Sequence, residues 1–333
     1  MSFKGWKKEK LLLQDGSITD SICPVILSAS RATDIPAFYS KWFSNRLRAG
    51  YMRWTNPFNA NQVQHVSFKH TRVIVFWTKN PKPLMAYLPQ IDEAGINYYF
   101  QYTLNDYDAE GLEPNVASLP KRIEVFKQLS DLVGPRRVIW RFDPLVLSNT
   151  ISIDVLLKRI SQIAFMLQGY THKLVISFAD IDMYKKVRNN LARQPYAYRE
   201  FSNELMETFA ERLMELNKEW GLEIATCAEL KDLQKYGISR NRCVDDDLLI
   251  DLFQEDSALM NFLGYKADLF GDTTRPNLKD KGQRKECGCI VSKDIGKYNT
   301  CNHLCAYCYA NTSESAVTKN LSKHNPISEA IIS

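Results

Sequence analysis

The chain has 333 residues, which suits one large domain or two ordinary ones, and 45% of them are hydrophobic, enough to build a sizeable core. This composition excludes a disordered chain and a fibrous repeat. The 43 Lys and Arg against 38 Asp and Glu leave a formal net charge of +5, which permits a nucleic-acid partner without requiring one, because a dedicated binder concentrates a larger excess on one face.

The apolar segments of the chain are all short. None approaches the roughly 20 residues that span a bilayer. The N-terminus carries Lys4, Lys7, Lys8 and Lys10 before only three leucines, so it lacks the apolar region of a signal peptide. We therefore expect a cytoplasmic protein with no membrane partner, whose eight cysteines are free thiols or metal ligands rather than disulfides.

Short apolar runs alternate with segments of helical period from residue 24 to about 228, which is the pattern of a parallel sheet with helical crossovers. Most runs are continuous in apolar residues, as buried parallel strands are. The expected strands are Val25 to Ser28, Arg72 to Trp77, Tyr98 to Thr103, Arg137 to Phe142, Lys173 to Phe178 and Leu222 to Thr226, with Gln62 to Phe68 as a further candidate.

Three helices between these strands have start and stop signals. Asp34 can open a helix that ends before Gly50. Ser152 can cap a second helix, whose apolar residues recur at helical spacing. Ser202 can begin a third, which ends at Gly221.

Six or seven strand-helix units fit either an open doubly wound sheet or a full or partial (β/α) barrel of the triosephosphate-isomerase (TIM) type. We favour the barrel, because no glycine-rich dinucleotide fingerprint follows the first strand and because polar residues follow almost every strand. In a barrel these positions converge at the C-terminal mouth, although turn chemistry alone accounts for about half of them. They are Ser28, Ser30, Arg31, Asp34, Thr78, Lys79, Asn80, Gln101, Thr103, Asn105, Arg141, Asp143, Ser177, Asp180, Asp182 and Glu229.

The expected organisation has four parts. Residues 1–23 form an N-terminal extension, and residues 24–285 form the α/β barrel domain. Residues 286–313 form a cysteine-rich segment packed on the barrel, and residues 314–333 form a flexible tail with few apolar residues.

The segment Cys301 to Cys308 has the form CxxxCxxC, with Tyr307 immediately before the last cysteine. A four-iron, four-sulfur ([4Fe-4S]) cluster normally takes four cysteine ligands. The three thiolates of Cys301, Cys305 and Cys308 would hold such a cluster and leave one iron open to a ligand that is not protein.

Zinc is the alternative for the cysteine-rich segment. A site of four cysteines, or of three cysteines and one histidine, could recruit Cys287, Cys289 and His303. Structural zinc usually uses paired CxxC knuckles, however, and this loop has only one. His303 lies between two of the proposed ligands, so we expect it to be exposed or beside the ligands rather than bound to metal.

The CxxxCxxC pattern with Tyr307 in place resembles the motif of the radical S-adenosylmethionine (SAM) enzymes. The resemblance implies that Cys301, Cys305 and Cys308 bind the cluster, that its open iron binds SAM, and that Tyr307 lies against the adenine. It also implies a reductant such as ferredoxin or flavodoxin, and cleavage of SAM to a 5′-deoxyadenosyl radical that abstracts hydrogen from a substrate. Soft thiolates suit this chemistry, and a closed barrel shields the radical from water.

The position of the loop differs from that family, whose members usually carry it after the first strand. A circular permutation accounts for the difference: Cys289 to Ser292 would supply the first strand, the cluster loop and a helix from Ala306 to Ser313 would follow, and Val25 to Ser28 would come second. By resemblance, four residues would then lie where the family holds the SAM amino group. They are Ser28, Ser30, Arg31 and Asp34.

A further set of motifs runs along the chain in a fixed order. The motifs are Ser28-Ala-Ser-Arg31, Trp77-Thr-Lys-Asn-Pro81, Arg141-Phe-Asp-Pro144, Cys227-Ala-Glu229 and Lys281-Gly-Gln-Arg-Lys-Glu-Cys287-Gly-Cys289. Their order resembles one narrower group, domain-of-unknown-function family 1848, which is loosely comparable with spore photoproduct lyase because of the cysteine cluster. The likeness runs from about residue 24 to 312 and indicates a cofactor better than a substrate.

Four other cysteines could work together, namely Cys227, Cys243 and the close pair Cys287 and Cys289. Four thiolates fully ligate a second [4Fe-4S] cluster, which could relay electrons or bind substrate. The alternative is that Cys227 and Cys243 are small buried hydrophobic residues, a common role of free cysteine and the one we expect for Cys23.

Two alternatives stay open for the function. The first is an iron-sulfur or zinc binding protein without SAM chemistry, acting in nucleic-acid binding or electron transfer. The segment Lys185 to Arg199, in which cations alternate with tyrosines, is its best contact with nucleic acid, although a solvated helix face followed by a loop is the simpler interpretation. The second is a hydrolase or lyase that uses Asp143, Asp180 or Glu229 as acid or base.

Overall fold

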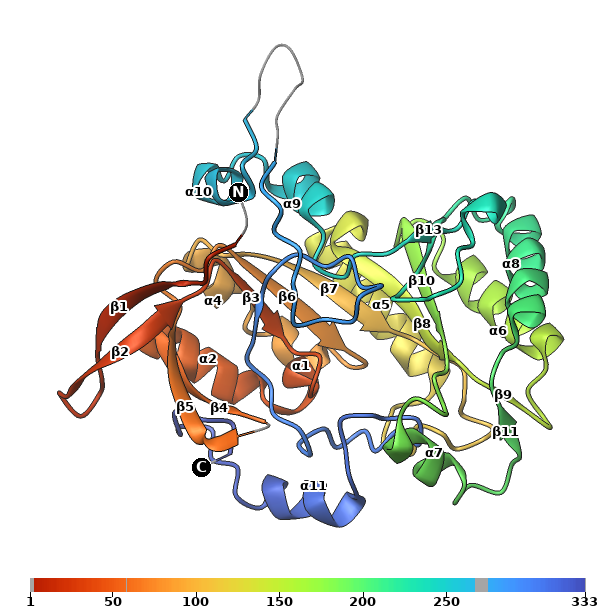
Figure 1. Ribbon diagram of the computed structural model, residues 1–333, viewed down its shortest axis with the longest axis horizontal. Coiled ribbons are helices and arrows are strands. Elements are labelled where there is room, and N and C mark those ends of the chain that lie inside the picture. The colour runs from red at the N-terminus through yellow and green to blue at the C-terminus, as the bar shows by residue number, and fades with distance from the viewer. Residues whose placement is uncertain (1–2, 58, 267–274, 333) are drawn as a thin grey trace.

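A parallel sheet of eight strands forms the centre of the protein (Figure 1). The computed structural model describes residues 3–57, 59–266 and 275–332. In spatial order the strands of this main sheet are β14 (Lys293–Asp294), β3 (Ile26–Ala29), β6 (Val73–Thr78), β7 (Asn97–Thr103), β8 (Val138–Leu145), β10 (Lys173–Phe178), β12 (Glu223–Thr226) and β13 (Ser239–Arg240). Each neighbouring pair is parallel, so the carboxyl ends of all the strands lie along one edge.

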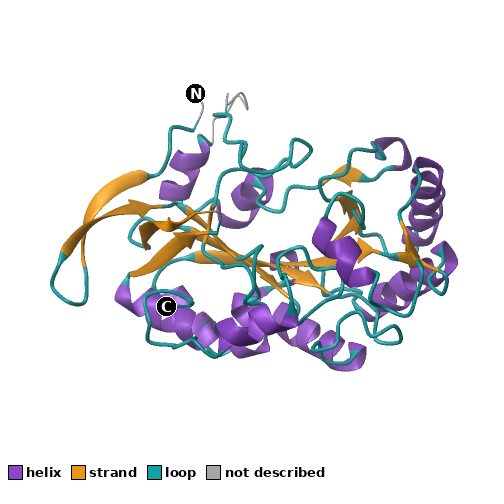
Figure 2. Ribbon diagram, turned by 60° about the horizontal axis from the view of Figure 1, so that its bottom comes forward, coloured by secondary structure: helices purple, strands orange, loops and turns teal. Residues whose placement is uncertain are grey.

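Helices cover both faces of the main sheet, most of them on one side (Figure 2). The better covered face carries α1 (Ile35–Phe38), α2 (Ser40–Ala49), α3 (Lys82–Met85), α4 (Leu88–Glu93), α5 (Leu119–Val133), α6 (Ile153–Met166), α7 (Lys185–Leu191) and α8 (Asn203–Asn217). The opposite face packs against α9 (Asp246–Phe253) and α10 (Ser257–Leu263). The last helix is α11 (Glu314–Leu321).

Alternate residues of each central strand enter two different hydrophobic clusters. In β6, Ile74 and Phe76 belong to the cluster under α2 and α5, whereas Val73 and Val75 belong to the cluster with α9 and α10. Successive side chains of a strand point to opposite faces, so a strand covered on both faces needs an unbroken apolar run. This requirement explains why the six strands expected from residue 25 to 226 are confirmed to within three residues at each end.

A second, four-stranded sheet packs beside the main one. Its strands, in spatial order, are β1 (Lys7–Leu12), β2 (Ile18–Cys23), β5 (Asn59–Ser67) and β4 (Tyr51–Asn56). The expected N-terminal extension therefore contributes the hairpin of β1 and β2, and the candidate strand from Gln62 to Phe68 belongs to this sheet rather than to the main one. A short pair is formed by β9 (Leu147–Ser148) and β11 (Tyr198–Arg199).

Of the full or partial barrel that the sequence led us to expect, the full barrel is not found. In the described part of the chain no ladder joins β13 to β14, so the main sheet has two free ends. The reason is that each end strand has only two residues and that the segment after β13 fills the gap, where the Ile290 N–H donates to the Val244 carbonyl at 3.0 Å. The protein is a mixed α/β fold with a large parallel sheet.

The last strand does lie beside the first, as a permuted chain requires. Lys293 pairs with Leu27 and Asp294 with Ser28 in the parallel ladder of β14 and β3. The expected position of this strand, Cys289 to Ser292, is wrong by a few residues, because Ile290 instead bridges to Lys279.

All three expected helix starts are confirmed, but one of the three helices is divided in two. The Ser152 and Ser202 hydroxyls accept from the N–H groups of Val155 and Leu205 and begin α6 and α8 as expected. Asp34 caps α1, but the expected single helix divides into α1 and α2 because Tyr39 leaves helical geometry, with φ −128° and ψ 18°.

The C-terminal segment packs on the molecule rather than extending from it as a flexible tail. It contains α11, and Ile331 is only 3% exposed. The Trp42 indole donates to the Ser328 carbonyl at 2.9 Å, and the Arg53 N–H donates to the Glu329 carbonyl at 2.9 Å. The few apolar residues of this segment pack against the rest of the protein, and its polar average composition gives no sign of this packing.

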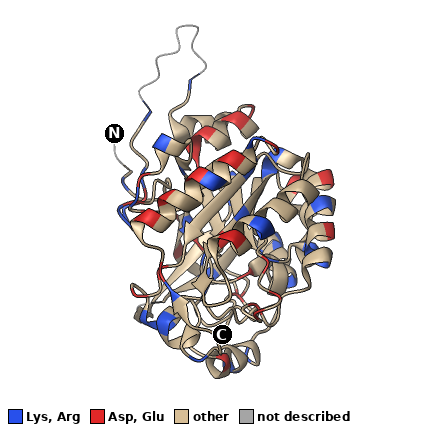
Figure 3. Ribbon diagram, turned by 90° about the vertical axis from the view of Figure 1, so that its right-hand side faces the viewer, with Lys and Arg blue, Asp and Glu red and all other residues tan. Residues whose placement is uncertain are grey.

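The charged surface is mixed rather than divided. On the side of the molecule that carries α6 and α8, basic and acidic segments are interspersed (Figure 3). This agrees with the small net charge of +5. Among the described residues, none of the helices has both the length and the apolar character that a membrane span requires.

Candidate functional site

Two groups of free cysteines lie along the carboxyl edge of the main sheet. The loop cysteines, Cys301, Cys305 and Cys308, dock where β3, β6 and β7 end. The four-cysteine set comprises Cys227 directly after β12, Cys243 shortly after β13, and Cys287 and Cys289 on the segment before β14. The zinc site considered from the sequence would have joined Cys287 and Cys289 to His303. In the structure, His303 belongs to the loop of the other cysteine group.

The loop cysteines are free thiols within electrostatic range of one another: Cys305 is buried, and Cys301 and Cys308 are half-buried. Burial raises the pKa of Cys305 to about 12, and the neighbouring Cys308 thiol adds to the shift. Burial likewise raises the pKa of Cys301, with further contributions from Asp34 and the other two thiols. Backbone N–H groups approach the sulfur atoms: His303 supplies one to Cys301, and the two residues at 310 and 311 supply one each to Cys308.

The loop that carries these cysteines is pinned by backbone contacts to distant segments. The Ala306 N–H donates to the Leu112 carbonyl at 2.9 Å. The Asn311 side chain donates to the Cys301 carbonyl at 2.8 Å, and the Tyr39 hydroxyl donates to the Thr300 carbonyl at 2.6 Å. These bonds fix the loop on the sheet edge without occupying its sulfur atoms.

Asp34 connects three elements at this edge. One carboxylate oxygen accepts from the Ala37 N–H at 2.9 Å and caps α1. The other accepts from the Lys79 N–H at 2.7 Å, after β6, and lies 2.8 Å from the His303 imidazole. His303 is therefore beside the loop cysteines, as one of the two expectations had it, but it is buried. Both oxygens of Asp34 already have partners.

Tyr307 is anchored by its hydroxyl in a buried polar network. The hydroxyl donates to Glu113 and lies 3.0 Å from the Lys79 ammonium and 2.9 Å from the Asn105 amide. Burial alone would raise the pKa of Glu113, but Lys79 and Arg122 outweigh it and lower that pKa to about 2. Glu113 carries the network, yet it stands in a loop with no motif around it, so no sequence signal indicated it.

Ser28, Ser30 and the backbone of Arg31 join β3 to the segment around β14. The Ser28 hydroxyl lies 2.7 Å from that of Ser292, and the Arg31 N–H donates to Asp294 at 2.8 Å. A Cβ on Gly296 would lie 1.8 Å from the Ser30 hydroxyl oxygen, so this close approach requires a glycine. The structure brings these residues together at the end of β3, as expected.

The Arg31 side chain lies between the two cysteine groups. The Arg31 carbonyl accepts from the Tyr309 hydroxyl at 2.8 Å, next to the loop cysteines. The Arg31 guanidinium stacks over Trp77 at 4.9 Å. Burial alone would lower the pKa of Arg31, but the nearby Cys289, Asp294 and Cys243 raise it.

The four-cysteine set is a continuous group of sulfur atoms. The Cys227 and Cys243 sulfurs are 3.6 Å apart. Cys289 accepts from the N–H groups of Cys243 and Val244 at 3.2 and 3.4 Å. The Arg141 guanidinium donates to the Cys243 sulfur at 3.0 Å. The structure therefore brings together the four cysteines that sequence reasoning grouped.

The family model described as domain of unknown function (DUF1848) matches residues 26–310. The chain belongs to the DUF1848 family. The matched range runs from β3 to just past the loop cysteines, so both cysteine groups of this DUF1848 protein lie inside it.

The other comparisons add little to the DUF1848 assignment. No curated protein matches the chain. A solved structure, that of a candidate alpha-L-fucosidase from Bacteroides thetaiotaomicron, is 9% identical over 71% of this chain and 79% of that chain, with a TM-score of 0.25. A similarity of that size supports no argument about the DUF1848 fold or its chemistry.

Acidic residues of the DUF1848 protein gather beside the four-cysteine set. Asp143 pairs with Arg141 and accepts from the Ser177 hydroxyl. Glu229 accepts from the Phe178 N–H at 2.9 Å, and burial raises the pKa of Glu229 to about 8. The third carboxylate expected as an acid or base, Asp180, lies close enough to Glu229 to add to this rise, and it pairs with Arg284 at 2.6 Å.

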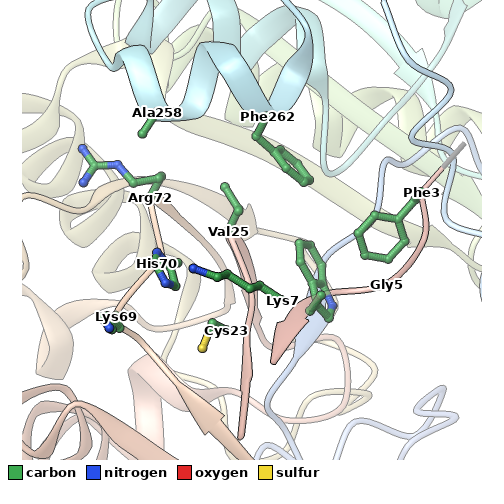
Figure 4. A pocket seen from close by; sticks show the side chains of 11 residues that line it. Phe3, Gly5, Lys7, Cys23, Val25, Lys69, His70, Arg72, Ala258 and Phe262 are labelled. Carbon is green, nitrogen blue, oxygen red and sulfur yellow. The ribbon is translucent and has the colours of Figure 1, made fainter. Parts of the chain in front are cut away.

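A cavity of about 460 Å³ lies at the opposite, amino edge of the main sheet (Figure 4). Val25 and Arg72, which precede β3 and β6, line it together with Cys23 and His70. Ligand atoms of Glu9, Cys23 and His70 lie within 4.8 Å of one another. The Glu9 carboxylate already pairs with two lysines and with His70. We therefore interpret this group as an ion-pair network and not as a metal site.

The segment Lys185 to Arg199, considered for nucleic-acid contact, begins as α7 and ends in β11. Val187 and Leu191 are buried, so one face of the short helix packs on the core. The Lys186 ammonium lies 5.7 Å from the Tyr298 ring centre, close to the loop cysteines. The structure thus has a helix followed by a loop, as the simpler interpretation expected, and the loop leads into the two residues of β11.

Proposed function

We propose that this DUF1848 protein is a radical SAM enzyme in which Cys301, Cys305 and Cys308 bind a [4Fe-4S] cluster through three of its irons. The observation that carries the proposal is the gathering of three free thiols, one buried and two half-buried and all within electrostatic range of one another, on a loop docked at the carboxyl edge of the sheet. Three soft ligands leave the fourth iron available to SAM.

The surroundings of the loop cysteines fit such a cluster. The thiols accept backbone N–H groups, as the thiolates of iron-sulfur sites do. Burial raises the pKa of both Cys305 and Cys308, and the nearby Lys79 ammonium opposes that rise, which favours the thiolate that metal binding requires. When bound, the cluster would supply the electron that cleaves SAM and releases a 5′-deoxyadenosyl radical able to abstract hydrogen from a substrate.

The remaining residues hold and shape this site. Glu113 and Lys79 fix the Tyr307 hydroxyl, so the ring keeps one orientation in which it could contact the adenine. Ser28 and Ser30 are the proposed contacts of the SAM amino group, whereas the Arg31 guanidinium, which can only donate, points toward the four-cysteine set. Asp34 acts differently, because both of its oxygens have partners: it orients His303 and the loop rather than binding SAM.

The architecture supports the same proposal. We interpret the main sheet as a partial, permuted barrel in which the last strand stands beside the first. The polar ends of β3, β6, β7 and β8 then line one mouth, with the cluster loop over it. The electron would come from a small donor protein such as ferredoxin or flavodoxin.

The test is anaerobic purification followed by reconstitution with iron and sulfide. The proposal predicts about four iron and four sulfide per chain at the loop, an electron paramagnetic resonance signal of the reduced cluster that changes when SAM is added, and release of 5′-deoxyadenosine with dithionite. Cys305→Ala should abolish the signal and the product. Cys23→Ala, a buried cysteine at the other sheet edge, is the matched control and should leave both intact.

Two results would favour the alternatives. A cluster that does not respond to SAM, or zinc on the loop cysteines, would indicate an iron-sulfur or zinc binding protein that acts on nucleic acid or in electron transfer. Substrate turnover that survives the replacement of all three loop cysteines by Ala would indicate a hydrolase or lyase based on Asp143 or Glu229.

A further inference from the structure

We propose that the four-cysteine set, Cys227, Cys243, Cys287 and Cys289, is a second metal centre and that it holds a structural zinc ion. This inference goes beyond the proposed radical chemistry and does not depend on it. It rests on the distance between two sulfur atoms, on the donors around them and on the buried positive charge beside them.

The sulfur spacing fits two ligands of one metal ion. Two thiolates bound to one tetrahedral zinc at about 2.3 Å each are separated by about 3.8 Å. The Cys227 and Cys243 sulfurs are 3.6 Å apart. In an iron-sulfur cube each cysteine binds a different iron, so its sulfurs must lie further apart than two ligands of the same ion. A second cube would therefore require this pair to separate.

The other two sulfurs are held next to this pair. The N–H groups of Cys243 and Val244 donate to the Cys289 sulfur at 3.2 and 3.4 Å, which places it against the backbone of Cys243. The Cys287 thiol interacts in turn with that of Cys289. The sulfurs thus form a chain of pairwise contacts from Cys227 through Cys243 and Cys289 to Cys287, and binding of one ion would draw the two ends of this chain together.

Neutral donors and charges around the sulfurs suit bound thiolates. The Asn241 amide and the Arg141 guanidinium donate to the Cys243 sulfur at 3.2 and 3.0 Å. Arg31 points its charge toward the set, and its Nη2 is buried with no hydrogen-bond partner in the described part of the chain. Four thiolates with Zn²⁺ carry two negative charges, which these two arginines can balance.

The site also has a structural task. Its ligands come from three segments: one after β12, one after β13 and one before β14. The last two meet at the free ends of the main sheet, where the Ile290 N–H donates to the Val244 carbonyl. One ion bound by both segments would hold these ends together where no strand ladder does. Structural zinc sites with four cysteine ligands do this kind of work in other folds.

The experiment uses the full chain with Cys301, Cys305 and Cys308 replaced by Ala, purified from cells grown with both iron and zinc. We expect about one zinc ion per chain, and a zinc-edge X-ray absorption spectrum that fits four sulfur neighbours at about 2.3 Å. Adding Cys243→Ser should remove the zinc. Adding Cys23→Ser, outside the set, should leave the zinc in place.

Two results would overturn the proposal. One is iron with acid-labile sulfide in the chain without loop cysteines, which would mean a cluster at this set. The other is a chain with no bound metal. If Cys243→Ser does not fold, the absorption spectrum of the parent chain decides, because a shell of oxygen or nitrogen neighbours contradicts the four-sulfur site. If the chain with its loop cysteines intact binds zinc at the four-cysteine set but no iron at the loop, the radical SAM function is refuted and this inference still holds.

Discussion

Glu113→Gln is the sharpest test of how the cluster loop is held. The Glu113 side chain is 1% exposed and pairs with Lys79 at 2.6 Å and with Arg122 at 3.3 Å, while accepting from Tyr307. Gln keeps the shape and loses the charge. Arg122 retains Asp108 at 2.6 Å, so the buried Lys79 ammonium is the group left without its counter-charge.

Two independent figures give the size of the expected effect. The pKa of Glu113 falls from 4.5 to about 2 in the folded protein, which corresponds to about 3 kcal/mol of folding free energy. Removing one partner of a buried ion pair costs about 3 to 5 kcal/mol. We therefore expect Glu113→Gln to lower the free energy of unfolding by about 3 kcal/mol at pH 7.

The assay is urea unfolding of both proteins, with Glu124→Gln on the exposed face of α5 as the control. Because the folded pKa is lowered, the contribution of the carboxylate is present above pH 4.5 and is lost as the pH falls toward 2. The difference between wild type and Glu113→Gln should therefore shrink by about 1 kcal/mol between pH 7 and pH 4. A difference no larger than that of Glu124→Gln, or one that grows on acidification, would refute the reasoning.

Three further predictions concern other parts of the structure. Burial raises the pKa of Glu229 from 4.5 to about 8, so between these two pH values the folded protein binds this proton more tightly than the unfolded chain does. The free energy of unfolding therefore falls as the pH rises from 4.5 to 8. Relative to wild type, Glu229→Gln should gain about 2 kcal/mol between pH 6 and pH 9 in urea unfolding, and a constant difference would contradict this. Gly296→Ala should lower stability by about 1 to 3 kcal/mol, because the new Cβ meets the Ser30 hydroxyl at 1.8 Å, whereas Gly282→Ala meets only a flexible carboxylate at 3.2 Å and should be nearly neutral. Finally, stripping zinc from the chain without loop cysteines should lower its thermal midpoint by about 5 °C or more, and an unchanged midpoint would argue against a structural ion.

The strands of the main sheet were predictable because their pattern is local. A strand buried on both faces is apolar along its length, and β6 shows this at every position except its last. The hairpin of β1 and β2 was missed for the same reason, because β1 is mostly exposed and polar along its length. The neighbour relation of β14 and β3 followed from the permutation implied by the loop, not from the two residues of β14 themselves.

Closure of the sheet could not be predicted in this way. Whether β13 meets β14 depends on what fills the space between them, and the contact that does so joins Val244 to Ile290 across a long stretch of chain. Two-residue strands carry too little pattern to indicate a ladder or its absence.

In the candidate site, too, local sequence patterns were predictable and contacts between distant residues were not. The spacing of Cys301, Cys305 and Cys308 is local, so the loop was visible in the sequence. The bond between Glu113 and Tyr307 spans 194 residues, and no local rule connects those two positions. Spacing grouped the four-cysteine set but did not indicate a metal for it, because the 3.6 Å between the Cys227 and Cys243 sulfurs, on which the proposed zinc site rests, appears only in the structure.

The cluster loop is anchored to segments that lie far from it along the chain, and this sets an order for its folding. The imidazole at residue 303 bonds a carboxylate 269 positions earlier, and the Ala306 N–H donates to the Leu112 carbonyl. The loop can therefore reach its position only after β3, β6 and β7 have assembled, because the surface that receives it does not exist before then. A peptide with the loop sequence alone would have the three thiols but none of the charged groups and carbonyls that position them.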